Sequence, residues 1–206
     1  MTNDRSTPVV EPVLSQDEDG PDHKHDWKYR TLTGMLGYLQ LTSRPDISMA
    51  THQCARFNSS PKLCHKQAVR RICKYLLGTM DKGIIFKPDV SKSLKCHVDA
   101  DFAGGWSSED TTNPEAVLPY TGFVISYAGC PIYWGSRLQI EIALSTTKVE
   151  YIALSVAMCE VLPFLNLTEE MRNFLPVRDD EPKFFCKVWK DTRSCIKVAE
   201  SPKFTP

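Results

Sequence analysis

The chain has 206 residues, 42% of them hydrophobic, and its 25 basic and 25 acidic side chains balance. This length predicts one or two domains that bury a core. The longest apolar stretches, such as residues 121–127, are far shorter than the roughly 20 residues of a membrane-spanning helix, so we expect no membrane partner. The amino terminus lacks a basic region followed by an apolar one, which argues against a secretory signal and favours an intracellular location, cytoplasmic or nuclear.

The eight cysteines occur without any C-x-x-C spacing, which argues against a zinc site. Most of them fall in apolar runs, where a free thiol behaves as a small buried hydrophobe. We therefore expect reduced, structural thiols.

Charge is distributed unevenly along the chain. Residues 1–26 are rich in acids, Pro and Ser and poor in large apolar groups, which predicts a disordered acidic tail or linker. Residues 56–95 contain ten Lys and Arg against two acids. A basic segment thus follows an acidic one.

Residues 27–82 show apolar positions at helical spacing and predict a small helical region. Leu32, Leu36 and Leu39 indicate a first helix that ends before Arg44-Pro45, since proline restricts its predecessor and lacks an amide donor. A second helix is predicted from Pro45 to about Phe57. A third follows the cap 59–61 and ends near Gly78.

One face of the third predicted helix is basic, with side chains recurring every four residues. The members of this stripe are Lys62, Lys66, Arg70 and Lys74. Such a stripe suits a phosphate backbone, although the solvated face of an ordinary amphipathic helix explains it equally well.

Residues 83–206 change to strand-like patterns first and helical ones later. We predict strands at 94–101, 118–127, 131–136 and 184–189, with a short strand or extended link at 83–88. A turn at Ala128-Gly129 joins two of them. A helix capped by residues 145–147 runs to about Cys159. Pro163 restarts or kinks the chain before a helix that ends near Phe174, and a short helix covers 191–200.

Two carboxylates, Asp99 and Asp101, lie at the end of the strand LKCHVDADFAGG. A loop-capping acid pair is the simpler explanation for a lone D-x-D. Glu150 and Asp191 lie at other element boundaries, however, and acids supplied from such places can converge on a hard divalent cation.

The segments HVDADFAGGW, STTKVEYIALS and KVWKDTRSCIKVA, in this order, resemble the ribonuclease H domain that ends the Pol polyprotein of copia-type retrotransposons. The upstream YRTLTGMLGYLQLTSRPDISMATHQCARF resembles the segment that connects reverse transcriptase to that domain. The resemblance covers roughly residues 27–206. It implies a mixed α/β, ribonuclease H-like fold with a five-stranded mixed sheet, preceded by a helical connection region.

By this resemblance, Asp99, Glu150 and Asp191 are the catalytic carboxylates and hold two Mg²⁺ ions, or Mn²⁺, while Asp101 is the weaker candidate for the first role. The implied activity is cleavage of the RNA strand of an RNA:DNA hybrid, in the context of the remaining Pol polyprotein. The alternative is a catalytically dead remnant that binds nucleic acid or a partner.

Three departures from the family pattern favour an incomplete active site. Thr192 stands where the family usually has Asn, and Lys148 stands where it has an acid. The family's fourth carboxylate follows a stretch like SPKFTP, at which this chain ends. Polymerase activity is not expected, because Asp179-Asp180 in VRDDEP lacks the Y-x-D-D context of a polymerase palm.

Overall fold

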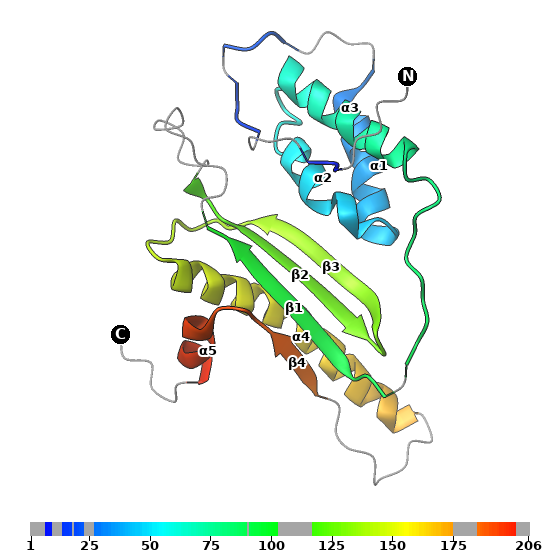
Figure 1. The fold of residues 1–206 in the computed structure, drawn as a ribbon, viewed down its shortest axis with the longest axis vertical. Coiled ribbons are helices and arrows are strands. Elements are labelled where there is room, and N and C mark those ends of the chain that lie inside the picture. The colour runs from blue at the N-terminus through cyan, green and yellow to red at the C-terminus, as the bar shows by residue number, and fades with distance from the viewer. Residues whose placement is uncertain are drawn as a thin grey trace. The chain divides into compact units, whose positions relative to one another are not determined.

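The computed structural model describes residues 7–9, 14–17, 19–22, 27–89, 91–102, 117–174 and 185–200. The chain forms two compact units, one made mainly of the residues up to Ile84 and one made mainly of those that follow, and Gly135–Arg137 group with the first. The part up to Ile84, here called the helical unit, is built on α1 to α3, and the sheet unit that follows carries a four-stranded sheet (Figure 1).

The helical unit consists of α1 (Tyr29–Thr42), a short 3₁₀ helix η1 (Pro45–Ile47), α2 (Ser48–Ala55) and α3 (Leu63–Leu77). The predicted break at Arg44-Pro45 is confirmed, since α1 ends at Thr42 and Pro45 opens η1. The apolar faces of these helices form one core, which includes Tyr29, Leu36, Ile47, Ala50, Cys54, Ala68, Val69, Ile72 and Tyr75.

The amino-terminal cap of α3 differs from the predicted one at residues 59–61. The cap residue is Lys62, whose backbone N–H donates to Nδ1 of the buried His65 at 2.9 Å. The other ring nitrogen of His65 lies 2.7 Å from the carbonyl oxygen of Ser15, and Lys62 Nζ pairs with Asp22 at 2.8 Å. Described parts of the acidic amino-terminal segment therefore lie against α3, a tertiary contact that no local cap signal contains.

The sheet unit contains a mixed sheet in the order β3-β2-β1-β4. Its strands are β1 (Leu94–Asp101), β2 (Tyr120–Tyr127), β3 (Cys130–Leu138) and β4 (Cys186–Trp189). β1 pairs antiparallel with β2 and parallel with β4. Ala128 and Gly129 join β2 to β3 with φ values of 51° and 79°, the positive values of a type I′ hairpin turn.

The prediction of five strands is wrong for the part of the chain that the structure describes, where the sheet has four. Residues 83–88 adopt no strand. Their lack of pairing agrees with Pro88, which has no amide to donate, and with the exposure of Ile85 and Phe86, which bury no face.

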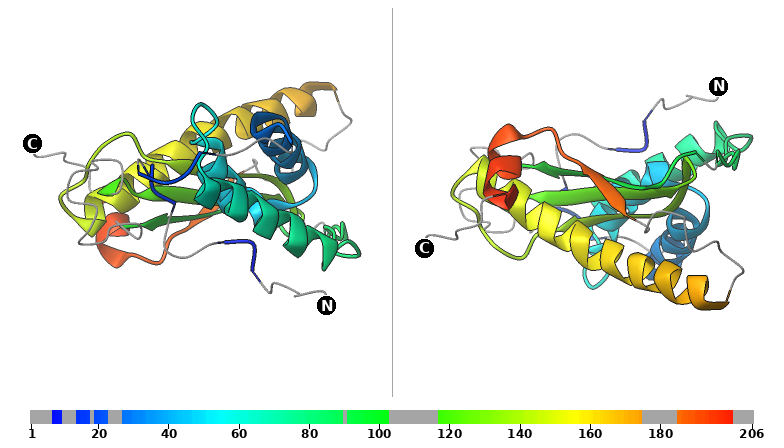
Figure 2. Two further views of the ribbon diagram at one scale, coloured as in Figure 1. Left: turned by 90° about the horizontal axis from the view of Figure 1, so that it is seen from above. Right: turned by 90° about the horizontal axis from the view of Figure 1, so that it is seen from below.

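A single long helix, α4 (Thr146–Phe174), runs along one face of the sheet (Figure 2). Its predicted cap is confirmed, because Ser145 Oγ accepts the Lys148 N–H at 3.2 Å. Of the two alternatives predicted at Pro163, a restart and a kink, the restart is wrong, since the helix continues through this residue. Apolar side chains on both sides of Pro163, namely Val161, Phe164 and Leu165, pack in the sheet core and offset the lost amide hydrogen bond.

By length and composition alone, α4 could cross a membrane, a property that the sequence analysis did not anticipate.

The core of the sheet unit also depends on this helix. Ala153, Ala157 and Val161 are fully buried against Leu94, Cys96 and Val98 of β1. The last helix, α5 (Arg193–Glu200), buries Cys195. Asp179 and Asp180 lie outside the described residues.

Candidate metal centre

The parallel pairing of β1 with β4 brings two acids side by side. His97 pairs with Trp189, and their rings stack with centroids 6.1 Å apart. Asp99 follows His97 by two residues and Asp191 follows Trp189 by two, so the two carboxylates extend past the same end of the ladder. β4 ends at Trp189, which leaves both acidic side chains 77% exposed.

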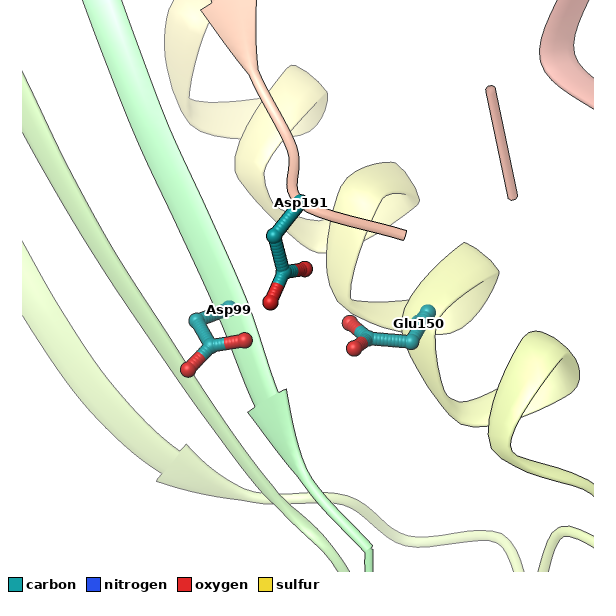
Figure 3. Close-up of side chains that lie close together, drawn as sticks. All are labelled: Asp99, Glu150 and Asp191. Atoms are coloured by element: carbon teal, nitrogen blue, oxygen red, sulfur yellow. The ribbon is translucent and has the colours of Figure 1, made fainter. Parts of the chain in front are cut away.

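Glu150 reaches this place from α4. The buried Gln139 ties the start of the helix to the sheet, donating from Nε2 to Thr121 Oγ1 at 3.0 Å and to the Val149 carbonyl at 3.1 Å. One carboxylate oxygen from each of Asp99, Glu150 and Asp191 lies within 4.8 Å of the other two. Figure 3 shows the three side chains pointing toward one another from β1, α4 and the end of β4.

Thr192 orients two of the acids. Its hydroxyl lies 3.0 Å from Glu150 Oε1 and 3.1 Å from Asp191 Oδ1, and its single hydrogen can be donated to one of them at a time. The residue that departs from the family pattern here thus still supplies a hydrogen-bond donor to the cluster.

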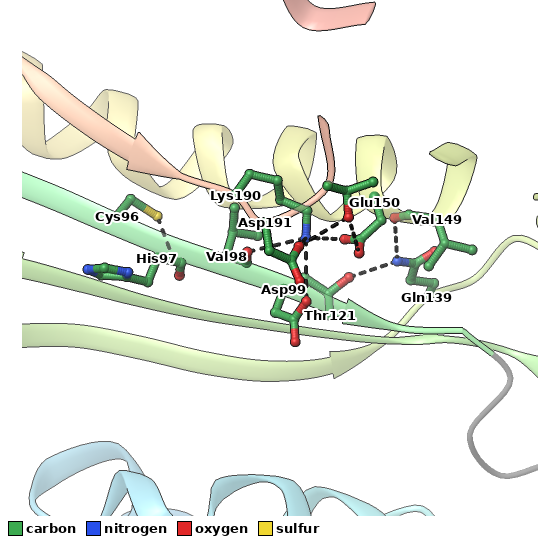
Figure 4. A network of polar contacts seen from close by, with 11 residues as sticks. Cys96, His97, Val98, Asp99, Thr121, Gln139, Val149, Glu150, Lys190 and Asp191 are labelled. Atoms are coloured by element: carbon green, nitrogen blue, oxygen red, sulfur yellow. Dashed lines mark hydrogen bonds and ion pairs between the residues drawn. The ribbon is translucent and has the colours of Figure 1, made fainter. Parts of the chain in front are cut away.

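A cation, Lys190, lies in the middle of the acids. Lys190 Nζ forms an ion pair with Glu150 Oε2 and lies 3.6 Å from Asp99 Oδ1 and 3.9 Å from Asp191 Oδ1. It also donates to the Val98 carbonyl at 3.2 Å (Figure 4). The Lys190 side chain is only 3% exposed. Lys148 instead faces Glu141 at 3.8 Å and is half exposed.

The donor set suits Mg²⁺ or Mn²⁺, which prefer carboxylate oxygens. Glu150 Oε2 is buried and accepts no hydrogen bond of regular geometry from the described residues; its contact is the Lys190 ammonium. Among these four described residues, three carboxylates face one ammonium, so negative charge is in excess, which favours a cation.

Sequence reasoning missed Lys190 and Gln139. A signal for Lys190 was available, because it directly precedes Asp191 at the end of an apolar strand. Asp101, the weaker candidate, ends β1 opposite Tyr120 and is not among the three clustered acids.

The predicted nucleic-acid face on α3 divides into two halves. Lys62 is 17% exposed and paired with Asp22, and Lys66 is buried. Arg70 and Lys74, further along the helix, are exposed. Binding of nucleic acid by this face stays a prediction, and only its carboxyl-terminal half is exposed.

Comparison with known proteins shows similarity to transposon polyproteins. The chain is 34% identical over 144 residues to the retrovirus-related Pol polyprotein from transposon RE1 of Arabidopsis thaliana, covering 70% of this chain and 9% of that protein. It is 30% identical over 176 residues to the Pol polyprotein from transposon TNT 1-94 of Nicotiana tabacum, covering 85% of this chain and 12% of that one.

A shorter relative is the secreted RxLR effector protein 161 of Plasmopara viticola, 33% identical over 134 residues, which cover 65% of this chain and 89% of that protein. No family model and no solved structure matches the chain. The chain spans about a tenth of the length of the transposon polyproteins that it matches. The chain belongs to the Pol polyproteins of copia-type retrotransposons, of which it represents a part.

Proposed function

We propose that this part of the Pol polyprotein is a ribonuclease H-type domain that hydrolyses the RNA strand of an RNA:DNA hybrid with a divalent cation. The observation that carries the proposal is the convergence of Asp99, Glu150 and Asp191 within 4.8 Å from three separate elements. A mixed sheet covered by one long helix, with acids at the end of β1, on α4 and after β4, is consistent with a ribonuclease H-like fold.

The three acids differ in exposure, which suggests different roles. Glu150 is 11% exposed and is held by Thr192, so it anchors the site. Asp99 and Asp191 are mostly exposed and face the side from which a phosphodiester can approach. A bound Mg²⁺ or Mn²⁺ ion supplies activation of a water and stabilisation of the leaving oxygen.

Cleavage of a labelled hybrid by the full chain tests this function. With Mg²⁺ or Mn²⁺ present, we expect cuts in the RNA strand alone, and loss of at least about 100-fold in rate for Asp99→Asn, since removing a transition-state stabiliser typically has effects of this size. Asp101→Asn is the matched control, because it makes the same change two residues away, outside the cluster. Equal rates for the two variants, or an uncut hybrid, would contradict the proposal.

The second candidate is a module that binds nucleic acid without cutting it. Two observations favour it: the Lys190 ammonium among the acids, and the exposure of Arg70 and Lys74 on α3. Binding to phosphates releases counter-ions, so affinity should depend weakly on sequence and strongly on salt.

The double variant Arg70→Ala/Lys74→Ala tests this candidate. It should reduce the slope of log affinity against log salt by roughly two, since each phosphate contact contributes nearly one unit. Lys82→Ala, at an exposed position after α3, serves as the control for an equivalent surface change. An unchanged slope and affinity in the double variant would mean that this face of α3 is only solvated.

A further inference from the structure

We propose that Lys190 is a built-in counter-ion of the carboxylate cluster, and that a divalent cation enters the cluster only by displacing the Lys190 ammonium. This inference rests on the proposed metal site and adds to it a residue that sets metal affinity. Without metal, Lys190 would then hold the acids together. It would also raise the metal concentration that is needed to fill the site.

The geometry places the ammonium where the cation must bind. Lys190 Nζ contacts Glu150 Oε2 and lies within 4 Å of oxygens on Asp99 and Asp191. A magnesium ion bound by these carboxylates has contacts of about 2.1 Å to their oxygens, so it must lie among the same atoms. An ammonium and a divalent cation cannot share that space, because they repel each other and compete for the same oxygens.

Burial makes the competition strong. The Lys190 side chain is 3% exposed and also donates to the Val98 carbonyl, so it is held in place by more than charge. To leave the cluster, the ammonium must break these contacts, which an exposed lysine does not have to do. The cluster nevertheless has an excess of negative charge, since three carboxylates face this one ammonium.

Two other lysines of the sheet unit separate direct competition from a general loss of positive charge. Lys148 lies on α4 two residues before Glu150 and is half exposed beside Glu141. Lys187 lies on β4, three residues before Lys190, and is exposed. Replacing either removes one positive charge without emptying the centre of the cluster.

The first measurement is Mn²⁺ binding to the full chain, by electron paramagnetic resonance and calorimetry. Lys190→Met should bind Mn²⁺ about 10- to 100-fold more tightly than the unmodified chain, the size of effect that groups next to metal ligands commonly have. Lys190→Gln, which keeps a hydrogen-bond donor without the charge, should give a smaller gain. Lys148→Met and Lys187→Met should change affinity by less than about 3-fold.

A second measurement needs no variant. If Mn²⁺ displaces the ammonium, the rate at which a soluble, amine-reactive acetylating reagent modifies Lys190 should rise several-fold as Mn²⁺ is added. The rate at which it modifies Lys187 should stay constant. Mass spectrometry of the labelled chain reports both sites at once. This readout applies even if the Lys190 variants fail to fold.

The outcomes separate this inference from the proposed function. Tighter Mn²⁺ binding by Lys190→Met with no hybrid cleavage supports the counter-ion role and contradicts the nuclease. The counter-ion role is contradicted if Lys190→Met and the unmodified chain bind Mn²⁺ with equal affinity. It is also contradicted if the acetylation rate of Lys190 does not change with Mn²⁺ concentration. Either result leaves the cleavage assay to decide the nuclease separately.

Discussion

Two buried cations, Arg44 in the helical unit and Lys190 in the sheet unit, have similar exposure and very different surroundings. The Arg44 side chain is 8% exposed and forms a bidentate pair with Asp46, with N–O distances of 2.9 and 2.7 Å. Its remaining donors reach the Thr79 carbonyl and hydroxyl, at 3.0 and 2.7 Å. Lys190 instead faces three carboxylates.

The difference separates a structural ion pair from a candidate functional site. At Arg44, one cation meets one acid, and the arginine holds the Asp46 pKa below its usual value through hydrogen bonding. Tyr75 donates a further hydrogen bond to Asp46 at 2.7 Å. Charge is balanced there, whereas the Lys190 cluster keeps an excess of negative charge that a metal can neutralise.

The largest effect should follow from breaking the balanced pair. Arg44→Met should destabilise the helical unit by about 3 kcal/mol, at the low end for buried pairs because Asp46 is 37% exposed. Hydrogen exchange measured by mass spectrometry should show the loss in α1 to α3 and none in the sheet. Arg30→Met, at an exposed position of α1, should change the stability by less than about 0.5 kcal/mol.

In metal-free buffer, Lys190→Met should lower the free energy of unfolding by a smaller amount, about 2 kcal/mol. The loss should be confined to the sheet unit. Only Glu150 among its partners is buried, and an unpaired buried acceptor has a cost of this order. The same exchange measurement should show recovery on adding Mn²⁺. If Glu150→Gln/Lys190→Met is as unstable as the sum of the single variants, the two residues are not coupled and the comparison fails.

Thr192→Val tests how much the acid cluster depends on its neutral donor. The variant keeps the shape and removes the hydroxyl, so we expect a loss of about 1 kcal/mol in urea unfolding of the sheet unit. Thr147→Val is the control, because its hydroxyl bonds the exposed Ser194 hydroxyl away from the acids. If Thr147→Val loses more stability than Thr192→Val, the loss comes from helix contacts and not from the hydrogen bond to the acids.

The smallest effect concerns pH and distinguishes the two units. Burial lowers the pKa of both His52 and His65 in the helical unit. Their neutral forms therefore stabilise the fold fully above the unfolded pKa of about 6.5, and this contribution is lost as the pH falls through the folded values. Urea unfolding of the helical unit between pH 7.5 and 5 should show the decline.

His65→Asn should flatten that decline, because it removes one of the two rings whose pKa is lowered by burial. His97→Asn should leave the decline in place, since His97 is exposed on β1 in the other unit. If the stability of the sheet unit falls by the same amount between pH 7.5 and 5, then His52 and His65 are not the cause of the decline in the helical unit.

The sequence by itself determined much of the local structure. Alternation in residues 94–101 identified β1, with Leu94, Cys96 and Val98 on the buried face and Asp99 on the other. The Ser145 cap of α4 and the break at Pro45 were also predicted correctly, because caps and prolines act through the nearest few residues. The family resemblance indicated which three acids to examine together.

Only the tertiary structure decided what surrounds those acids. Lys190 lies among them because β4 pairs parallel with β1 and ends at Trp189, and no local pattern specifies that register. Pro163 remains inside α4 because the helix packs against the sheet on both sides of it. Lys66 is buried although its periodicity matched a basic surface stripe, since helical spacing defines a face but not what covers that face.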